Sequence, residues 1–253
     1  MAADSPLPSD PTHSLPRPWG PWLTLLFGVV LLLGYATAQG LFMIPLPALY
    51  AAGGTPPARV HEVGMSGFNF ALATLGGCPV MVMLCGLVGW ARRGPTLGEY
   101  FAVRTVTLRG LIGWVLLIVA VGCGLSILND VLERPPPEFI VDAFASAGDW
   151  RLFWAAIVVC APVAEETLFR GFLYAGWASS RMGPTGAILV TTVLFTLIHA
   201  GQYGWVDLVQ LSIIGLCLGI ARARSGSILP SVAMHIALNF TSLLIYAATR
   251  GVR

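Results

Sequence analysis

Three ionisable side chains lie close together in a stretch that is otherwise apolar: Glu165, Glu166 and Arg170. Between residues 150 and 177 the only other charged residue is Arg151, at the start of the stretch. One charge near the centre of a membrane span costs roughly 2.5 to 3.5 kcal/mol, so three together indicate a function. Glu166 and Arg170 are four residues apart, which predicts an ion pair on one helix face. Glu165 lies about 100° round the helix and is left without a local partner.

Later apolar stretches contain His199, His235 and Asn239. The last two are four residues apart and therefore share a helix face. These three residues and Glu165 each lie roughly nine to fifteen residues from an expected helix start, which at 1.5 Å per residue places them at middle depth. Antiparallel packing can therefore bring all four together. Taken singly, a His or Asn in a membrane helix often only hydrogen-bonds a neighbouring helix.

The four side chains have the chemistry that hydrolysis of an amide by water requires. A carboxylate in a low-dielectric pocket can take and return a proton near neutral pH. An imidazole can position the same water, and an imidazole together with an amide can donate to an oxygen that becomes negative. No G-x-S-x-G motif is present and no pattern marks Cys160 as an activated nucleophile.

The composition indicates how these residues are held. The chain has 253 residues, of which 56% are hydrophobic and 10% charged, with a mean hydropathy of +0.78. Such a chain is too apolar for a soluble globular domain, so we expect an all-α polytopic transmembrane bundle. The net charge of +2 is small and its arginines are scattered, which argues against a nucleic-acid partner. The cysteines lack metal-ligand spacing, so neither a metal nor a cofactor is expected. They are Cys78, Cys85, Cys123, Cys160 and Cys217.

Hydropathy predicts about seven membrane spans, and six or eight would also fit. The expected spans cover residues 21–44, 68–90, 111–132, 150–177, 186–200, 205–221 and 228–248. The fifth is barely long enough, because a span needs roughly 17 to 25 residues. Two amphipathic stretches, 96–109 and 139–147, are predicted as helices lying at the membrane surface.

The chain divides into three parts by composition. Residues 1–20 are rich in Pro and Ser and are expected to be a disordered tail. They do not read as a signal peptide, because the first apolar run starts too late and is too long. Residues 21–149 would form N-terminal transmembrane helices and surface segments, and residues 150–250 the catalytic core. His13 in the tail and His61 in a loop carry no catalytic signal.

The distribution of arginines predicts the orientation. The connections after the second, fourth and sixth spans carry Arg92, Arg93, Arg104, Arg109, Arg181, Arg222 and Arg224. The connection after the third span is acidic, with Glu133, Glu138, Asp142 and Asp149 against one arginine. The positive-inside rule therefore predicts a cytoplasmic N-terminus, and we expect the site to be reached from the cytoplasm. Arg250 and Arg253 then lie outside, against the rule.

Three motifs follow one another on successive apolar segments: Glu165-Glu166-x-x-x-Arg170, Phe195-x-x-x-His199 and His235-x-x-x-Asn239. This arrangement resembles the CAAX protease and bacteriocin-processing family. That family is also called the type II CAAX prenyl endopeptidase or ABI family of glutamic intramembrane proteases. The resemblance covers about residues 150–245, and no motif position departs from the pattern.

The resemblance implies an all-helical membrane core with a catalytic cavity inside it. Glu165 would activate water with help from His199, and His235 and Asn239 would stabilise the oxyanion. Glu166 and Arg170 would hold the site in shape. The substrate would be a membrane-anchored or membrane-associated protein or peptide, with membrane lipids around it. Eukaryotic members cleave prenylated C-terminal tripeptides, whereas many bacterial members have other or unknown substrates. Short loops and the arginine bias fit a bacterial inner membrane protein.

Three alternatives stay open on the residues alone. Glu165, His199 and His235 could be ligands of a zinc protease, although the chain lacks H-E-x-x-H. The same groups could form an ion path in a transporter or immunity-type membrane protein, although no paired broken spans mark a repeat-built carrier. A non-catalytic scaffold is the third alternative. Metal analysis with a chelator test separates the zinc protease, replacement of Glu165 by Gln separates the transporter, and the same experiment at His199 and His235 separates the scaffold.

Overall fold

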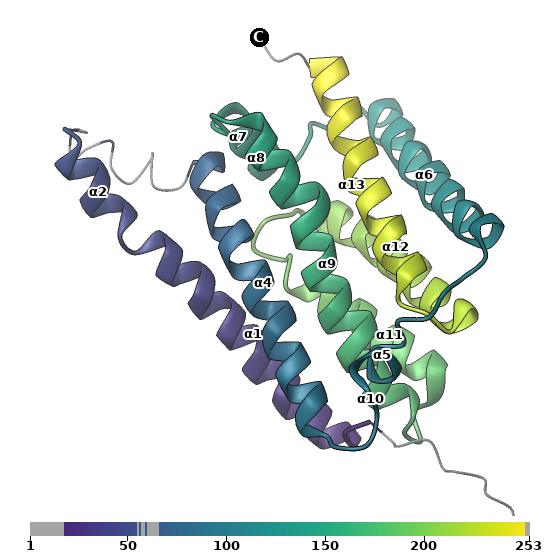
Figure 1. Ribbon diagram of the computed structural model, residues 1–253. Helices are drawn as coiled ribbons and strands as arrows, with labels where there is room; N and C mark the ends of the chain where they lie inside the picture. Colours follow the sequence, from purple (N-terminus) through teal and green to yellow (C-terminus); the bar gives the residue numbers. More distant parts are fainter. Residues whose placement is uncertain (1–17, 55, 57–58, 60–65, 251–253) are drawn as a thin grey trace, which may run out of the picture.

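The computed structural model describes residues 18–54, 56, 59 and 66–250. Within that part of the chain every regular element is a helix, as predicted (Figure 1). His13, His61 and most of the expected tail at 1–20 lie outside the described residues.

The described residues of the N-terminal half form three long helices and three short ones. They are α1 (Pro21–Met43), α2 (Leu46–Ala52), α4 (Gly67–Ala91), α5 (Leu97–Tyr100), α6 (Leu108–Val131) and α7 (Glu138–Ala145). Pro21 is the first residue of α1, a position where the missing N–H of proline costs no helical hydrogen bond. The helix expected at 139–147 is confirmed by α7.

The C-terminal half begins with one unbroken helical rod. Its segments are α8 (Trp150–Trp154), the π-helical η1 (Ala155–Cys160), α9 (Ala161–Glu166), the π-helical η2 (Thr167–Leu173) and α10 (Tyr174–Ala178). Then follow α11 (Gly183–Leu197), α12 (Trp205–Ser225) and α13 (Leu229–Arg250). Six helical stretches of the described chain are long and apolar enough to cross a membrane, and α11, with 15 residues, is a shorter apolar helix. The predicted polytopic bundle is thus confirmed.

The surface helix predicted for residues 96–109 is wrong beyond its first turn. Thr96 and Glu99 form a capping box that starts α5, but the backbone at Ala102 has φ of 51° and ends the helix there. The carbonyls of Ala102 and Arg104 instead accept hydrogen bonds from Ile228 N and Ser227 Oγ. The segment therefore ties the start of α6 to the α12–α13 connection rather than lying free on the membrane.

The helices pack in pairs around the rod at 150–178, with α1 antiparallel to α4 and α6 parallel to α13 (Figure 1). α1 pairs with α4 on one side, and α6 with α13 on the other, while α11 and α12 form a hairpin (Figure 1). Both α4 and α13 touch α9, the segment that carries the two glutamates. The least buried of the long helices is α6, in which Ile118 alone is buried. The rod is thus held from both sides, whereas α6 stands at the edge.

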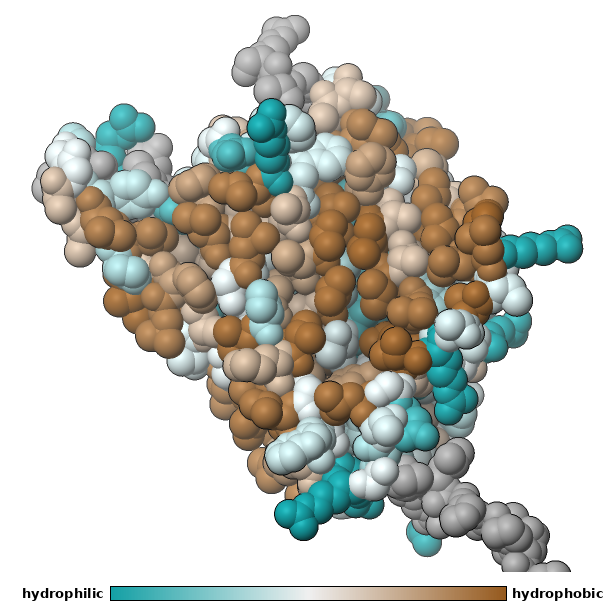
Figure 2. All heavy atoms as spheres, viewed as in Figure 1, coloured by the Kyte–Doolittle hydropathy of each residue, from teal (hydrophilic) through white to brown (hydrophobic). Residues whose placement is uncertain are grey.

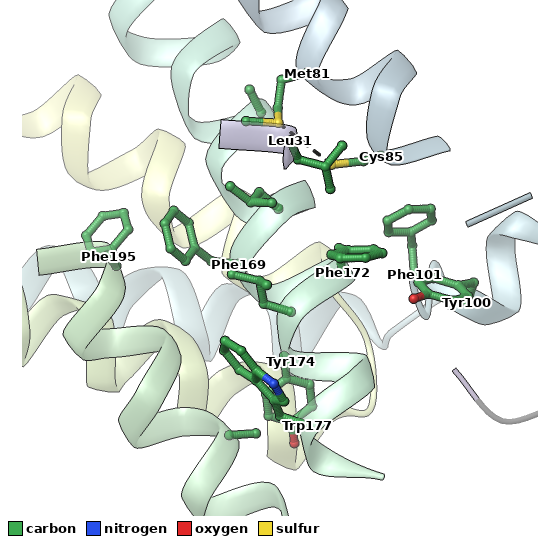
Figure 3. Close-up of a cluster of buried hydrophobic side chains, with 14 of the residues drawn as sticks. Leu31, Met81, Cys85, Tyr100, Phe101, Phe169, Phe172, Tyr174, Trp177 and Phe195 are labelled. Carbon is green, nitrogen blue, oxygen red and sulfur yellow. Dashed lines mark hydrogen bonds between the residues drawn. The ribbon is translucent and has the colours of Figure 1, made fainter. Parts of the chain in front are cut away.

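Aromatic side chains fill the core next to the glutamates (Figure 3). Phe169 and Phe172 of the rod meet Phe101 from the α5 segment and Phe195 of α11 within one buried cluster. Phe169 and Phe195 pack edge to face with ring centroids 5.4 Å apart. Lipid is as apolar as these rings, so close packing rather than exclusion from water holds the helices together.

The outer surface fits a membrane setting. Apolar side chains cover most of the middle of the face in Figure 2, and hydrophilic ones gather mainly toward its upper and lower ends. Trp22, Trp90, Trp150 and Trp205 are exposed near helix ends, where an interfacial aromatic belt would place them.

Candidate active site

Pro162 sets the backbone geometry just before the two glutamates. In η1 the N–H of Ala161 donates to the carbonyl of Ala156, five residues back. It therefore does not donate to the carbonyl of Ile157, which would be its partner in an α-helix. The π-type donor for Ile157 would be residue 162, but proline has no N–H. The Ile157 carbonyl therefore has no donor within its own helix. It accepts instead from Asn239 Nδ2 of α13, 2.9 Å away.

A second π-helical segment follows the glutamates and has a similar effect. In η2 the N–H of Tyr174 bonds to Phe169 O rather than to Arg170 O, its α-helical partner. The Arg170 carbonyl accepts from Nε of Arg222 on α12 at 3.0 Å. Each π segment thus presents a backbone carbonyl to a side chain from a neighbouring helix. π turns are rare and occur frequently at functional sites.

Glu166 and Arg170 form the predicted ion pair, at 2.9 Å between Arg170 Nη1 and Glu166 Oε1. Both side chains are 0% exposed. The other terminal nitrogen of Arg170 donates to Gly215 O at 2.9 Å, and the guanidinium lies 4.9 Å from the centroid of the Phe195 ring. A buried pair of this kind is costly to break, because one charge is then left without compensation.

His235 lies between the two glutamates. Its Nδ1 is 3.0 Å from Glu166 Oε1, and its Nε2 is 3.9 Å from Glu165 Oε2. Glu166 is the partner of Arg170 and is taken as ionised, so it can only accept and Nδ1 of His235 donates. This contact fixes the orientation of the ring, as outer carboxylates do for functional histidines. Nε2 then faces Glu165, and it accepts in the neutral ring and donates in the imidazolium.

Glu165 and Glu166 are adjacent in sequence but lie in different surroundings. The Glu165 side chain is 20% exposed, and the described residues give it no hydrogen bond. The ion-pair contact that the described residues give it is with His235 Nε2, at 3.9 Å. Glu166 is closed off by Arg170 and His235. Of the two carboxylates, Glu165 is therefore the one that can bind water.

His199 closes the end of α11. Its ring Nδ1 contacts Phe195 O at 2.7 Å, and a carbonyl only accepts, so Nδ1 carries the proton. The N–H of His199 itself bonds to Thr196 O, which leaves the Phe195 carbonyl for the ring. Helix ends leave such carbonyls without helical partners. In the neutral ring Nε2 is then free to accept a proton.

The structure brings the predicted site residues together only in part. His235 contacts both glutamates, and Asn239 follows one turn later on α13. His199 and His235 lie on the same Phe195 ring, at centroid distances of 4.9 Å and 5.8 Å. In the described part of the chain no hydrogen bond or ion pair joins His199 to Glu165. The contact that exists is between Glu165 and His235.

The three residues of the zinc alternative are not gathered into a ligand set. Among the residues that the structure describes, no group of three His, Cys, Asp or Glu side chains is placed to hold a metal ion.

Sequence reasoning missed a polar group on α1 and α4 beside Glu165. Gln39 Nε2 donates to the Tyr35 hydroxyl at 3.0 Å, and that hydroxyl contacts Cys78 Sγ at 3.6 Å. Tyr35 and Cys78 both lie within the electrostatic reach of Glu165. Tyr35 and Gln39 are four residues apart in an apolar helix, the same signal that identified His235 and Asn239.

Comparisons with known proteins agree with this architecture. Residues 147–241, which hold the rod and all six proposed site residues, match the family described as "Type II CAAX prenyl endopeptidase Rce1-like". The chain is also 31% identical over 175 residues to an "Uncharacterized 24.3 kDa protein" of Escherichia coli. That alignment covers 66% of this chain and 77% of the relative. No solved structure matches.

Proposed function

Since the chain belongs to the type II CAAX prenyl endopeptidase Rce1-like family and is a membrane protease of that general kind, we propose that it is a glutamic endopeptidase. In this proposal Glu165 activates the hydrolytic water. The substrate is a peptide bond of a membrane-associated protein or peptide.

The observation that carries the proposal is the contrast between the two glutamates. Glu166 is fully buried, and its Oε1 is bonded to both Arg170 and His235, so this carboxylate is closed to water. Glu165 is partly exposed, and the nearer ring nitrogen of His235 is 3.9 Å away. A base must be able to reach the water whose proton it takes. Glu165 meets that requirement. Glu166 contributes indirectly, because it orients the ring of His235.

The proposed reaction is hydrolysis without a covalent enzyme intermediate. Glu165 takes a proton from water while the water oxygen bonds to the carbonyl carbon of the substrate. The electron pair of the C=O bond moves to the carbonyl oxygen, which becomes an oxyanion. When the oxyanion collapses, the C–N bond breaks and Glu165 returns the proton to the leaving nitrogen. Water is consumed, and a carboxylic acid and an amine are formed.

Asn239 and His235 are the proposed donors to the oxyanion. One N–H of the Asn239 amide is used by Ile157 O, and the second remains to donate. The bond to Ile157 fixes which way the amide points. His235 can donate from Nε2 as the imidazolium while Nδ1 stays on Glu166. Such oriented donors are usually a large part of the rate enhancement in acyl-group hydrolysis.

His199 is proposed as an assistant to Glu165, acting through Nε2. Its Nδ1 is occupied by Phe195 O, and its ring packs beside Tyr203 with centroids 5.9 Å apart. A role for His199 requires that water or substrate bridge the gap between this ring and Glu165. Glu166 and Arg170 are positioning residues in this scheme, because they act through His235.

The setting proposed for the protein is a bacterial inner membrane with a cytoplasmic N-terminus. The arginine bias of the connections supports this orientation. Residues 150–250 are proposed as the catalytic core and residues 21–149 as its supporting part. The Tyr35–Cys78 contact lies near Glu165. It supports a proposal that residues 21–149 also contribute side chains to the site and do not only hold the core in place.

The test compares membrane proteins, by mass and terminus, between cells with the unaltered protein and cells with Glu165→Gln. We expect one or more proteins to remain uncut in the mutant, while the variant itself reaches the membrane in normal amount. The matched control is Glu138→Gln, an exposed glutamate at the start of α7, which is expected to process normally. A transporter or a scaffold predicts unchanged processing with Glu165→Gln, and that result would overturn the proposal.

A further inference from the structure

Arg222 is a buried arginine that lacks an acidic partner. It lies in the last turn of α12 and is 8% exposed, and its Nε donates to Arg170 O at 3.0 Å. Among the residues that the structure describes, no carboxylate lies within ion-pair distance of its guanidinium. A charge buried in this way is costly unless an opposite charge compensates it. An anion from outside the chain can supply that charge.

The two terminal nitrogens of Arg222 can bind such an anion. In the described part of the chain neither has a hydrogen-bond partner, and neither is among the fully enclosed atoms, so both retain some contact with the surface. The guanidinium lies over the ring of Tyr174, 4.8 Å from its centroid. The ring and the Nε bond together hold the guanidinium plane, so its terminal N–H groups form a fixed fork.

The hydroxyl of Tyr174 is a further donor beside this fork. The described residues give it no hydrogen bond, and the oxygen is not fully enclosed although the residue is only 5% exposed. Figure 3 shows it pointing away from Phe169 and Phe172, out of the aromatic core. A phenolic hydroxyl can donate to an anion without adding charge. Arg222 and Tyr174 thus present a charged and a neutral donor group side by side.

Arg104 brings a second positive charge to this place. Its main chain is held by Ser227, whose Oγ donates to Arg104 O at 2.7 Å and accepts from Arg104 N at 3.4 Å. The exposed side chain of Arg104 lies within electrostatic reach of Arg222. Glu99, the acid within reach of Arg104, is engaged in the capping box of α5. Two like charges repel each other, and an anion bound between them removes that repulsion.

The surroundings of Arg222 are also basic. The connections that follow α4 and α10, together with the last turn of α12, contain one acidic residue, Glu99. Their arginines are Arg92, Arg93, Arg104, Arg181, Arg222 and Arg224. Arg222 lies near the end of a helix that is long and apolar enough to span a membrane, which is the depth of lipid headgroups. Basic pockets between membrane helices bind the headgroups of anionic lipids.

From these contacts we infer a binding site for the phosphate group of an anionic phospholipid, formed by Arg222, Tyr174 and Arg104. The fork of Arg222 binds two phosphate oxygens, Tyr174 donates to the same group, and Arg104 covers it from the exposed side. A phosphate suits this set better than a carboxylate does, because the fork alone occupies both oxygens of a carboxylate. The site is separate from the proposed catalytic residues and does not depend on proteolysis.

The first experiment measures thermal unfolding of the purified full chain in a neutral detergent. Phosphatidylglycerol, phosphatidylcholine or inorganic phosphate is added at increasing concentration. A ligand that binds only the folded protein raises the unfolding temperature in proportion to the logarithm of its concentration. We expect such a rise with phosphatidylglycerol and little change with the other two. An equal rise with phosphatidylcholine would overturn the anionic headgroup, and an equal rise with inorganic phosphate would overturn the lipid.

Two variants locate the binding of phosphatidylglycerol. Tyr174→Phe removes the hydroxyl and keeps the ring under Arg222, and Arg104→Gln removes the outer charge at an exposed position. Each should weaken binding on the order of tenfold, because a hydrogen bond to a charged group is lost. Both variants leave the bond from Arg222 Nε to Arg170 O in place, whereas a replacement of Arg222 itself would break it.

The matched control is Arg181→Gln, an exposed arginine in the connection between α10 and α11. It removes the same charge from a basic connection but not from the proposed site, so we expect binding of phosphatidylglycerol to change less than twofold. If Arg181→Gln weakens binding as much as Arg104→Gln does, the lipid is attracted by the overall charge and the site is overturned. Unchanged binding in Tyr174→Phe and Arg104→Gln would also overturn it.

Discussion

The side-chain amide of Asn239 donates to the backbone carbonyl of Ile157 at 2.9 Å, across the contact between α13 and the rod at 150–178. The bond exists because Pro162 supplies no N–H to that carbonyl. A proposed oxyanion donor is thus held by the backbone of the helix that carries the proposed base. The bond fixes the Asn239 amide relative to the backbone of the helix that carries Glu165.

Restoring the missing N–H should therefore disturb catalysis more than folding. In Pro162→Ala the new N–H can bond within the helix, which removes the cause of the π turn and shifts the Ile157 carbonyl. A displacement on the order of 1 Å can cost about 10²-fold in rate, so we expect a large loss of cleavage with an unchanged or raised unfolding temperature. The matched control is Pro79→Ala in α4, which we expect to cleave normally. Full activity of Pro162→Ala would contradict this reading of the proline.

Breaking the buried ion pair should destabilise the protein strongly. Arg170→Leu leaves Glu166 buried and uncompensated, which costs about 3–5 kcal/mol of unfolding free energy. Thermal unfolding in detergent measures the effect, with exposed Arg151→Gln as a control expected to stay within about 0.5 kcal/mol.

The double replacement Glu166→Leu with Arg170→Leu separates stability from activity. We expect it to regain much of the stability, since an apolar pair often replaces a buried ion pair at little cost. Cleavage should remain lost, because His235 then lacks the carboxylate that orients it. A double variant that cleaves normally would show that Glu166 has no positioning role.

Replacing His199 by asparagine or by leucine should abolish cleavage in both cases, but the two variants should differ in stability. An asparagine can still donate to Phe195 O, whereas a leucine cannot, and an unmet buried carbonyl costs roughly 1–3 kcal/mol. We expect both His199→Asn and His199→Leu to lose cleavage and only the second to unfold at a markedly lower temperature. Cleavage by His199→Asn at the normal rate would remove His199 from the proposed mechanism.

Metal removal tests the zinc alternative directly. We expect purified protein to contain far less than one zinc per chain and to cleave its substrate unchanged after chelation. The physical reason is that no group of three His, Cys, Asp or Glu side chains is placed to hold a metal ion among the described residues. Stoichiometric zinc, with activity lost on chelation and restored by zinc, would establish the metalloprotease instead.

Hydropathy and helical spacing predicted much of the fold and one contact of the site. The expected span at 150–177 is observed as a continuous rod at 150–178, and Glu166 pairs with Arg170 as their spacing indicates. Both features depend on a single helix. They can therefore be predicted from residues that are close in sequence.

Contacts between helices could not be predicted in the same way. That His235 contacts Glu166 more closely than Glu165 depends on how α13 is rotated against the rod, and the π segments change the rotation of the rod itself. Pro162 was a visible signal for the first π segment, but hydropathy does not distinguish a π turn from an α turn. The helix predicted at 96–109 was wrong for a related reason. Backbone carbonyls of this segment accept hydrogen bonds from Ser227 and Ile228, which are distant in sequence.

The shortness of α11 has a consequence for the supply of water. Fifteen residues extend about 22 Å, less than the hydrocarbon thickness of about 30 Å. His199 lies in the non-helical turn at residues 198–204 that follows this helix, so non-helical backbone lies at a depth where it is tolerated only inside protein or against water. Water that reaches this turn has to cross only part of the bilayer depth, so we expect the short helix to ease the supply of water to His199.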